Sequence, residues 1–168
     1  MIGNNKGAEF ESRVGEILET LERIHPGSVR VFTKPLYKLR EDEEIIPDFE
    51  LHFDLLFEEA RYIIECQNRE KTDSALAHKI RHIKALTRKN RFIFVYGGSP
   101  TEWNLAAYKN DGILTMSIAE FSLFVGRISI QLHRSGHPDE VSVEDFDLEL
   151  ARFLEDDVSP SDYERKIS

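Results

Sequence analysis

The sequence predicts a mixed α/β domain in which helices flank both faces of a central sheet. Three observations lead to this prediction. Apolar residues recur at three- and four-residue spacing over 7–24, which is typical of an amphipathic helix. They alternate with polar residues over 48–57, which is typical of a strand with one buried face. Helical and extended patterns then follow one another to residue 155, as in a layered α/β fold.

Each element has a local signal. The sequence HPG at 25–27 ends the first helix, and the apolar run RFIFVY beginning at residue 91 is closed by two glycines. The polar stretch 35–47 is expected to be a loop or a strand extension. The predicted elements are, in order, helix 7–24, strand 28–34, hairpin strands 48–57 and 62–67, helix 72–89, strand 91–98, short helix 103–109, strand 112–117, helix 118–126, strand 128–133 and helix 142–155.

Length and composition place the chain among globular proteins. Its 168 residues, 40% of them hydrophobic, are enough for one domain with a sizeable core. No apolar run approaches the roughly 18 residues that a membrane span needs, and the first residues have no apolar signal core, so a cytoplasmic protein without a membrane partner is expected. The single cysteine, Cys66, excludes an intramolecular disulfide and a multi-cysteine zinc site.

The net charge of −9 is unevenly distributed. Residues 138–168 hold 11 acidic and 3 basic residues, which predicts a main domain over 1–137 followed by an acidic C-terminal helix and tail over 138–168. Residues 71–91 run the other way, with 7 Lys or Arg and one Asp. A basic stretch on a nearly neutral body is able to meet a phosphate backbone.

The hairpin carries the candidate chemistry. A turn centred between Glu59 and Ala60 pairs Asp54 with Glu65 on one face, with Gln67 two residues further along. Cys66 then points to the core side, where a buried thiol is expected. Two adjacent carboxylates repel each other unless a cation lies between them, and hard oxygen ligands suit Mg²⁺ or Mn²⁺. The sequence therefore predicts a metal site at Asp54 and Glu65.

These residues resemble the PD-(D/E)XK nuclease superfamily, and its Mrr-like restriction endonucleases most. GAEFESRVGEILETL resembles the family's first helix and supplies Glu11, while FDLLFEEARYIIECQ resembles its core hairpin and supplies Asp54 and Glu65. GILTMSIAEFSLFV resembles a later strand and helix, so the likeness covers roughly residues 7–126. It implies a restriction-endonuclease-like three-layer fold, Mg²⁺ or Mn²⁺ as cofactor, and the backbone carbonyl of Cys66 as a further metal ligand.

Two positions leave alternatives open. The family is named for a Pro-Asp pair, which occurs here at Pro47–Asp48, and Asp48 shares a strand face with Asp54. Asp54 is preferred, because an apolar pair follows it and the gap to Glu65 matches the short-hairpin members. Gln67 stands where the family usually has Lys; it donates a hydrogen bond but supplies no positive charge. Lys71, at the start of the next helix, is a candidate substitute.

The predicted function is metal-dependent hydrolysis of DNA phosphodiesters. Asp54 and Glu65 would bind the metal, Glu11 would support it, and Gln67 would orient the attacking water. The basic residues expected to track phosphates are Lys71, Lys79, Arg81, Lys84, Arg88 and Lys89. The alternative is a catalytically inactive module of the same fold that binds DNA or a partner protein in a defence or repair complex. A homodimer or a larger assembly is a further expectation.

Overall fold

The structure is a computed structural model of the chain. It describes residues 3–40, 43–55, 58–68, 82, 91–97, 113–134, 142, 144–146 and 148. The elements are, in chain order, α1 (Gly3–Ile24), β1 (Val29–Thr33), β2 (Tyr37–Arg40), β3 (Glu43–Ile45), β4 (Phe49–Asp54), β5 (Glu59–Gln67), β6 (Arg91–Tyr96), β7 (Leu114–Ser117) and α4 (Ile118–Arg134).

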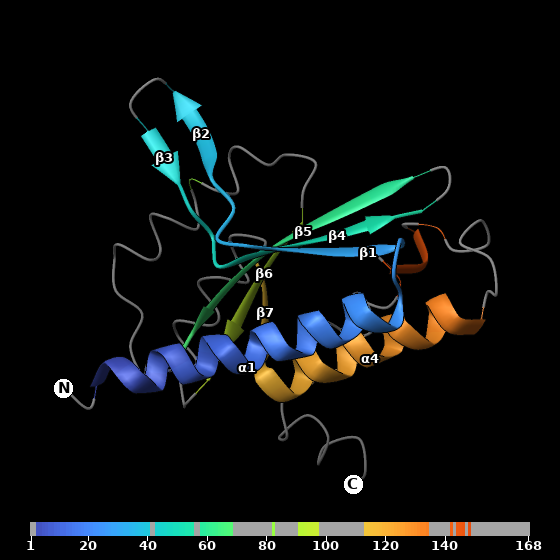
Figure 1. The fold of residues 1–168 in the computed structure, drawn as a ribbon, viewed down its shortest axis with the longest axis horizontal. Helices are drawn as coiled ribbons and strands as arrows, with labels where there is room; N and C mark the ends of the chain where they lie inside the picture. The colour runs from blue at the N-terminus through green and yellow to red at the C-terminus, as the bar shows by residue number, and fades with distance from the viewer. Residues whose placement is uncertain are drawn as a thin grey trace, which may run out of the picture.

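Five strands form a mixed sheet in the order β1-β4-β5-β6-β7 (Figure 1). The β1–β4 and β4–β5 pairs are antiparallel, and the β5–β6 and β6–β7 pairs are parallel. The predicted mixed α/β class is therefore confirmed, while helices on both faces of the sheet stay a prediction. Of the helix predicted at 72–89 only His82 is described, and it is helical, while the short helix predicted at 103–109 lies outside the described residues.

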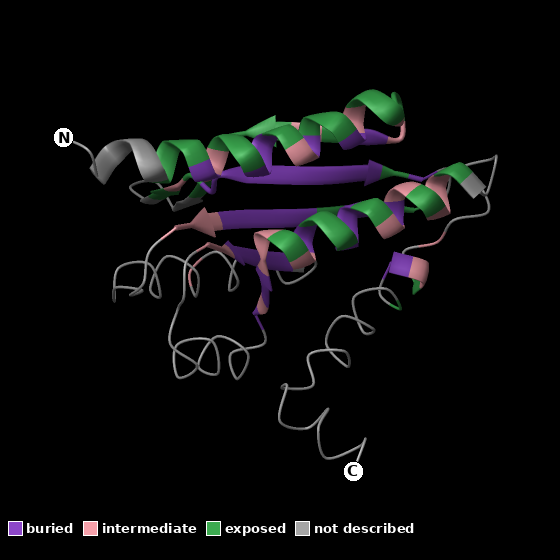
Figure 2. Cartoon of the chain, turned by 90° about the horizontal axis from the view of Figure 1, so that it is seen from below, coloured by how far each residue is buried: buried purple, intermediate pink, exposed green. Residues whose placement is uncertain are grey.

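The two long helices, α1 and α4, lie side by side over one face of the sheet (Figures 1 and 2). Their sheet-facing side chains are buried together with the inward residues of β4 and β5. Helical spacing in α1 and α4 and alternation in the strands thus supply one continuous apolar layer. Its fully buried members include Val14, Leu18, Leu51, Phe53, Tyr62, Ile64, Phe121, Phe124 and Ile128.

The opposite face of the sheet carries a smaller apolar cluster. Its buried members are Ile63, Phe92, Phe94 and Ile113. Tyr37 and Ile45, from the antiparallel ribbon of β2 and β3, pack against this cluster. Within the polar stretch 35–47, β2 and β3 are therefore strands that contribute to covering the second face.

Helix α4 corrects the prediction for 118–133. The sequence was expected to form a helix to residue 126 and a strand from 128, because Ile128, Ile130 and Leu132 alternate. The structure has one helix from Ile118 to Arg134. Ile128 lies four residues after Phe124 and is fully buried with it, whereas Ile130 is half exposed. Gly126 inside a helix costs only about 1 kcal/mol relative to Ala, which the burial of Ile128 offsets.

Two serines, Ser117 and Ser142, each cap the start of a helix, together with the acidic residue three positions later. The Glu120 N–H lies 3.1 Å from Ser117 Oγ, and the Asp145 N–H lies 3.3 Å from Ser142 Oγ. Residues 144–146 are helical, as predicted for 142–155, and Phe146 is fully buried against Phe53. None of the helices in the described part of the chain combines the length and the apolar character needed to span a membrane.

Candidate functional site

The hairpin register differs from the prediction. In the structure β4 and β5 turn between Leu55 and Glu58, whose backbone groups hydrogen-bond to each other. Asp54 therefore faces Glu59, and Phe49 faces Ile64. The turn lies three residues earlier than expected. Ala60 is buried in the same layer as Tyr62 and Ile64, so the alternation of β5 begins closer to the turn.

Asp54 is consequently remote from Glu65, and the predicted pairing of these two residues is wrong. Six residues of extended chain separate Glu59 from Glu65, or about 20 Å. The Asp54 side chain is half exposed and lies 3.9 Å from Arg30 Nη2. It forms a surface ion pair at the far end of the hairpin.

Asp48, the second candidate, is the acid that meets the end of β5. The Asp48 backbone N–H donates to Glu65 Oε1 over 2.9 Å, and the Cys66 N–H donates to Asp48 Oδ2 over 3.0 Å. Asp48 is 9% exposed and Glu65 3%. The buried carboxylates of Asp48 and Glu65 thus lie together where β4 begins and β5 ends, and each accepts a backbone hydrogen bond from the other segment.

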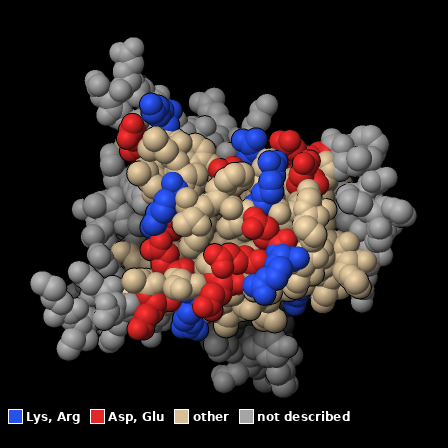
Figure 3. Space-filling model, in the orientation of Figure 1, with Lys and Arg blue, Asp and Glu red and all other residues tan. Residues whose placement is uncertain are grey.

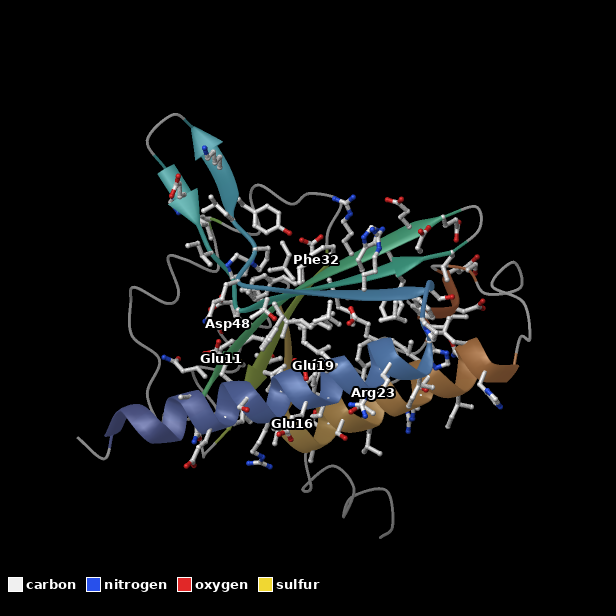
Figure 4. The ribbon with its side chains drawn as sticks, viewed as in Figure 1. Glu11, Glu16, Glu19, Arg23, Phe32 and Asp48 are labelled. Atoms are coloured by element: carbon white, nitrogen blue, oxygen red, sulfur yellow. The ribbon has the colours of Figure 1, made fainter. Side chains whose placement is uncertain are left out.

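Glu11 reaches the same place from α1, as predicted (Figure 4). Its neighbour Phe10 is buried in the core, which fixes this turn of the helix against the sheet. Lys34 links Glu11 to Asp48, because its Nζ lies 2.6 Å from Glu11 Oε1 and 2.9 Å from Asp48 Oδ1.

Lys34 is the site residue that sequence reasoning missed. It follows β1, which pairs with β4, and its N–H donates to the Asp48 carbonyl over 2.9 Å. Burial alone would lower the pKa of the Lys34 ammonium, but its hydrogen bonds to Glu11 and Asp48 outweigh burial and raise that pKa above its ordinary value. The local sequence TKP carries no signal for this role, because the role depends on the β1–β4 register.

Gln67 ends β5 beside these carboxylates. Its carbonyl accepts the Gly97 N–H over 3.0 Å, which joins the ends of β5 and β6. Its side-chain Oε1 is buried and has no hydrogen-bond partner among the residues that the structure describes. A buried acceptor of this kind normally has a water, an ion or another donor as its partner.

Gly97 brings the strand ends close to α1. A Cβ at this position would lie 2.7 Å from Phe10 Cε2 and 2.7 Å from Asn68 Oδ1. Only glycine fits without moving the side chain next to Glu11 or the residue after Gln67. The close packing at Gly97 therefore helps to position Phe10, which precedes Glu11, and Asn68, which follows Gln67.

The surroundings of Cys66 disfavour its thiolate form. Burial, and then the nearby Asp48 carboxylate, raise the pKa of Cys66 above its ordinary value, so the reactive thiolate is suppressed. The Cys66 Sγ lies 3.5 Å from Asp48 Oδ2. The prediction of a core-side thiol agrees with its packing against the first apolar layer. Its backbone carbonyl as a metal ligand stays a prediction.

The donor set of this cluster fits Mg²⁺ or Mn²⁺. Carboxylates of Glu11, Asp48 and Glu65 and the buried amide oxygen of Gln67 are the hard oxygen ligands that these ions prefer. Within the described ranges, however, no three His, Cys, Asp or Glu side chains converge as a ready metal group. The Lys34 ammonium lies between two of the candidate ligands.

A second polar group lies on the same face of the sheet, around Glu50, two residues after Asp48. Tyr37 Oη donates to Glu50 Oε2 in a short hydrogen bond, and Arg61 Nε lies 3.9 Å from Glu50 Oε1. Burial and the Glu50 carboxylate raise the pKa of Tyr37. Glu50, the acid of this group, has both a hydroxyl and a guanidinium partner, as in a structural network.

The predicted phosphate-tracking residues lie outside the described residues. These are Lys71, Lys79, Arg81, Lys84, Arg88 and Lys89. On the face drawn in Figure 3, the described acidic and basic side chains are interspersed. This view thus gives no continuous basic surface among the described side chains.

No family model and no curated protein matches the sequence. Among solved structures, the fold is similar to that of protein VC1899 from Vibrio cholerae, with a TM-score of 0.51 and 13% identity. The match covers 73% of this chain and 33% of that protein, so the chain spans about a third of its length. A protein of unknown function, AF1548, has a TM-score of 0.45 at 15% identity, covering 64% of this chain and 58% of that one. At such identities the first similarity concerns the α/β fold alone.

Proposed function

We propose that the chain is a metal-dependent deoxyribonuclease of the PD-(D/E)XK superfamily with a restriction-endonuclease-like three-layer fold. The observation that supports this most is the β4–β5 register, which brings Asp48 of the Pro47–Asp48 pair to Glu65. Gln67 follows on the same strand, and Glu11 joins through Lys34. Asp48 thereby replaces Asp54 in the motif that the sequence resembles.

The chain's own residues have distinct roles in this proposal. Asp48 and Glu65 would hold Mg²⁺ or Mn²⁺, with Glu11 supporting the ion or its waters. The Gln67 side chain would hydrogen-bond the attacking water and fix its direction. When bound, the ion polarises a phosphoryl oxygen and lowers the pKa of a bound water. The basic residues of 71–91 would contact the DNA backbone without reading sequence.

The direct test is hydrolysis of plasmid, linear and branched DNA in Mg²⁺ and in Mn²⁺. We expect cleavage by the wild-type protein and a loss on the order of 100-fold or more in Glu65→Ala, because a buried metal ligand is removed. Glu59→Ala, on the same strand but half exposed, is the matched control and is expected to retain activity. Equal cleavage by the wild type and Glu65→Ala would remove this site from the reaction.

A lysine at position 67 tests the departure from the family pattern. Gln67→Lys adds a positive charge near the reacting phosphate, so we expect it to preserve or raise the cleavage rate and to relax the dependence on the metal. The measurement is the cleavage rate against Mg²⁺ and Mn²⁺ concentration, with Gln67→Met as the control that keeps side-chain length without a polar group. A Gln67→Lys variant slower than Gln67→Met would contradict the role given to this position.

The second candidate is a non-catalytic module of the same fold that binds DNA or a partner protein in a defence or repair complex. Two observations favour it. Lys34 already neutralises Glu11 and Asp48 without a metal, and Gln67 supplies no positive charge. DNA binding that persists in EDTA, together with no cleavage by the wild type, would support this candidate. Size measurement in solution would test the proposed homodimer or larger complex.

A further inference from the structure

The positive charge between Glu11 and Asp48 comes from the protein itself. The Lys34 ammonium contacts one oxygen of each carboxylate, at 2.6 and 2.9 Å. In the part of the chain that the structure describes, Lys34 is the cation paired with both residues. It links α1 to the residue before β4 and so fixes the distance between two of the candidate metal ligands.

The backbone at Lys34 is unusual for this residue. Its φ is +52°, in the left-handed region that favours glycine, and proline follows it. The Lys34 N–H donates to the Asp48 carbonyl, so this conformation is tied to the site. A simple turn would be served best by glycine or asparagine. The presence of lysine in this conformation points to a use for its ammonium.

The Lys34 side chain is also able to move away from Glu11 and Asp48 into solvent. The side chain of Lys34 is 50% exposed, compared with 12% for the side chain of Asp48. A flexible four-carbon stem allows the ammonium to move into water without disturbing the buried layer. The Lys34 backbone is therefore fixed by its hydrogen bond to Asp48, while its ammonium is free to be replaced by another cation.

We infer that Lys34 is a positioning residue that holds Glu11 and Asp48 in the metal-free site, and that a divalent cation displaces its ammonium from both. This rests on the proposed function, because the displacing ion is the one expected at that site. A divalent cation that bound the oxygens that Lys34 contacts would compete with the ammonium for the same lone pairs. The two cations also repel each other at such a short range.

The test is metal binding measured by calorimetry with MgCl₂ and MnCl₂, which requires no activity. Lys34→Met removes the competing charge, so we expect it to bind the metal about tenfold more tightly than the wild type. Lys34→Arg keeps the charge and spans both carboxylates, so its affinity should equal or fall below that of the wild type. Lys38→Met, at an exposed position of β2, controls for the loss of a surface charge.

Thermal unfolding gives a second readout of the same exchange. Without metal, Lys34→Met should melt below the wild type, because Glu11 and Asp48 lose their counter-charge. Saturating Mg²⁺ should raise its melting temperature more than that of the wild type. Lys34→Gln replaces Lys34→Met if the latter fails to fold.

The outcomes separate the two proposals. Equal metal affinity in the wild type and Lys34→Met would overturn the exchange and leave the metal site standing. Weaker binding in both Lys34→Met and Lys34→Arg would assign Lys34 a purely structural role and also overturn it. No binding by any variant would reject the exchange together with the metal-dependent function. Binding by Lys34→Met but not by the wild type would support the exchange.

Discussion

Asp48→Asn is expected to abolish metal binding and DNA cleavage, whereas Asp54→Asn is expected to retain both. Asp48 is buried beside Glu65 and Cys66, and its carboxylate is one of the candidate metal ligands. The amide keeps the size of the side chain but removes its charge, so a loss of at least about 100-fold in activity is expected. Calorimetry with Mg²⁺ and the plasmid cleavage rate measure the two effects.

Asp54→Asn makes the same chemical change at the last residue of β4, whereas Asp48 directly precedes its first residue. Asp54 is half exposed and pairs with Arg30 over 3.9 Å, so the change should alter stability by less than about 1 kcal/mol. The two variants together decide between the aspartates. Loss of cleavage in Asp54→Asn with an active Asp48→Asn would reject the assignment made from the register.

The aspartate choice shows where sequence reasoning failed. Alternation correctly placed Asp48 and Asp54 on one strand face, because the side-chain period of a strand is two. Their partners depend on where the hairpin turns, and EEAR gives no strong turn signal. The actual turn lies between Leu55 and Glu58. A shift of three positions in the turn moved the partner of Glu65 by six residues.

Other parts of the site could be predicted from the sequence. Glu11 follows a core phenylalanine on a strongly periodic helix, and Gln67 ends an apolar strand, so both positions were predictable. Lys34 was not, because it meets Asp48 through the β1–β4 pairing and Glu11 through the packing of α1. Such long-range juxtapositions leave no local pattern in the chain.

The apolar layer between the sheet and the two long helices provides the largest expected effect on stability. Phe53 is fully buried on β4, with its ring 5.7 Å from that of Tyr62 and 4.7 Å from that of Phe146. Phe53→Ala removes both ring contacts and leaves a cavity, so it should lower the free energy of unfolding by about 3–5 kcal/mol. Chemical denaturation followed by circular dichroism measures this change.

Phe32→Ala is the matched control for this prediction. Phe32 lies on β1 and is 42% exposed, so its replacement should cost less than about 1 kcal/mol. A double-mutant cycle between Phe53 and Phe146 adds a test of the C-terminal segment, with an expected coupling of about 0.5–1.5 kcal/mol. Zero coupling would contradict the packing of Phe146 against Phe53. The expected coupling would make Phe146 part of the core that holds β4, and therefore Asp48, in register.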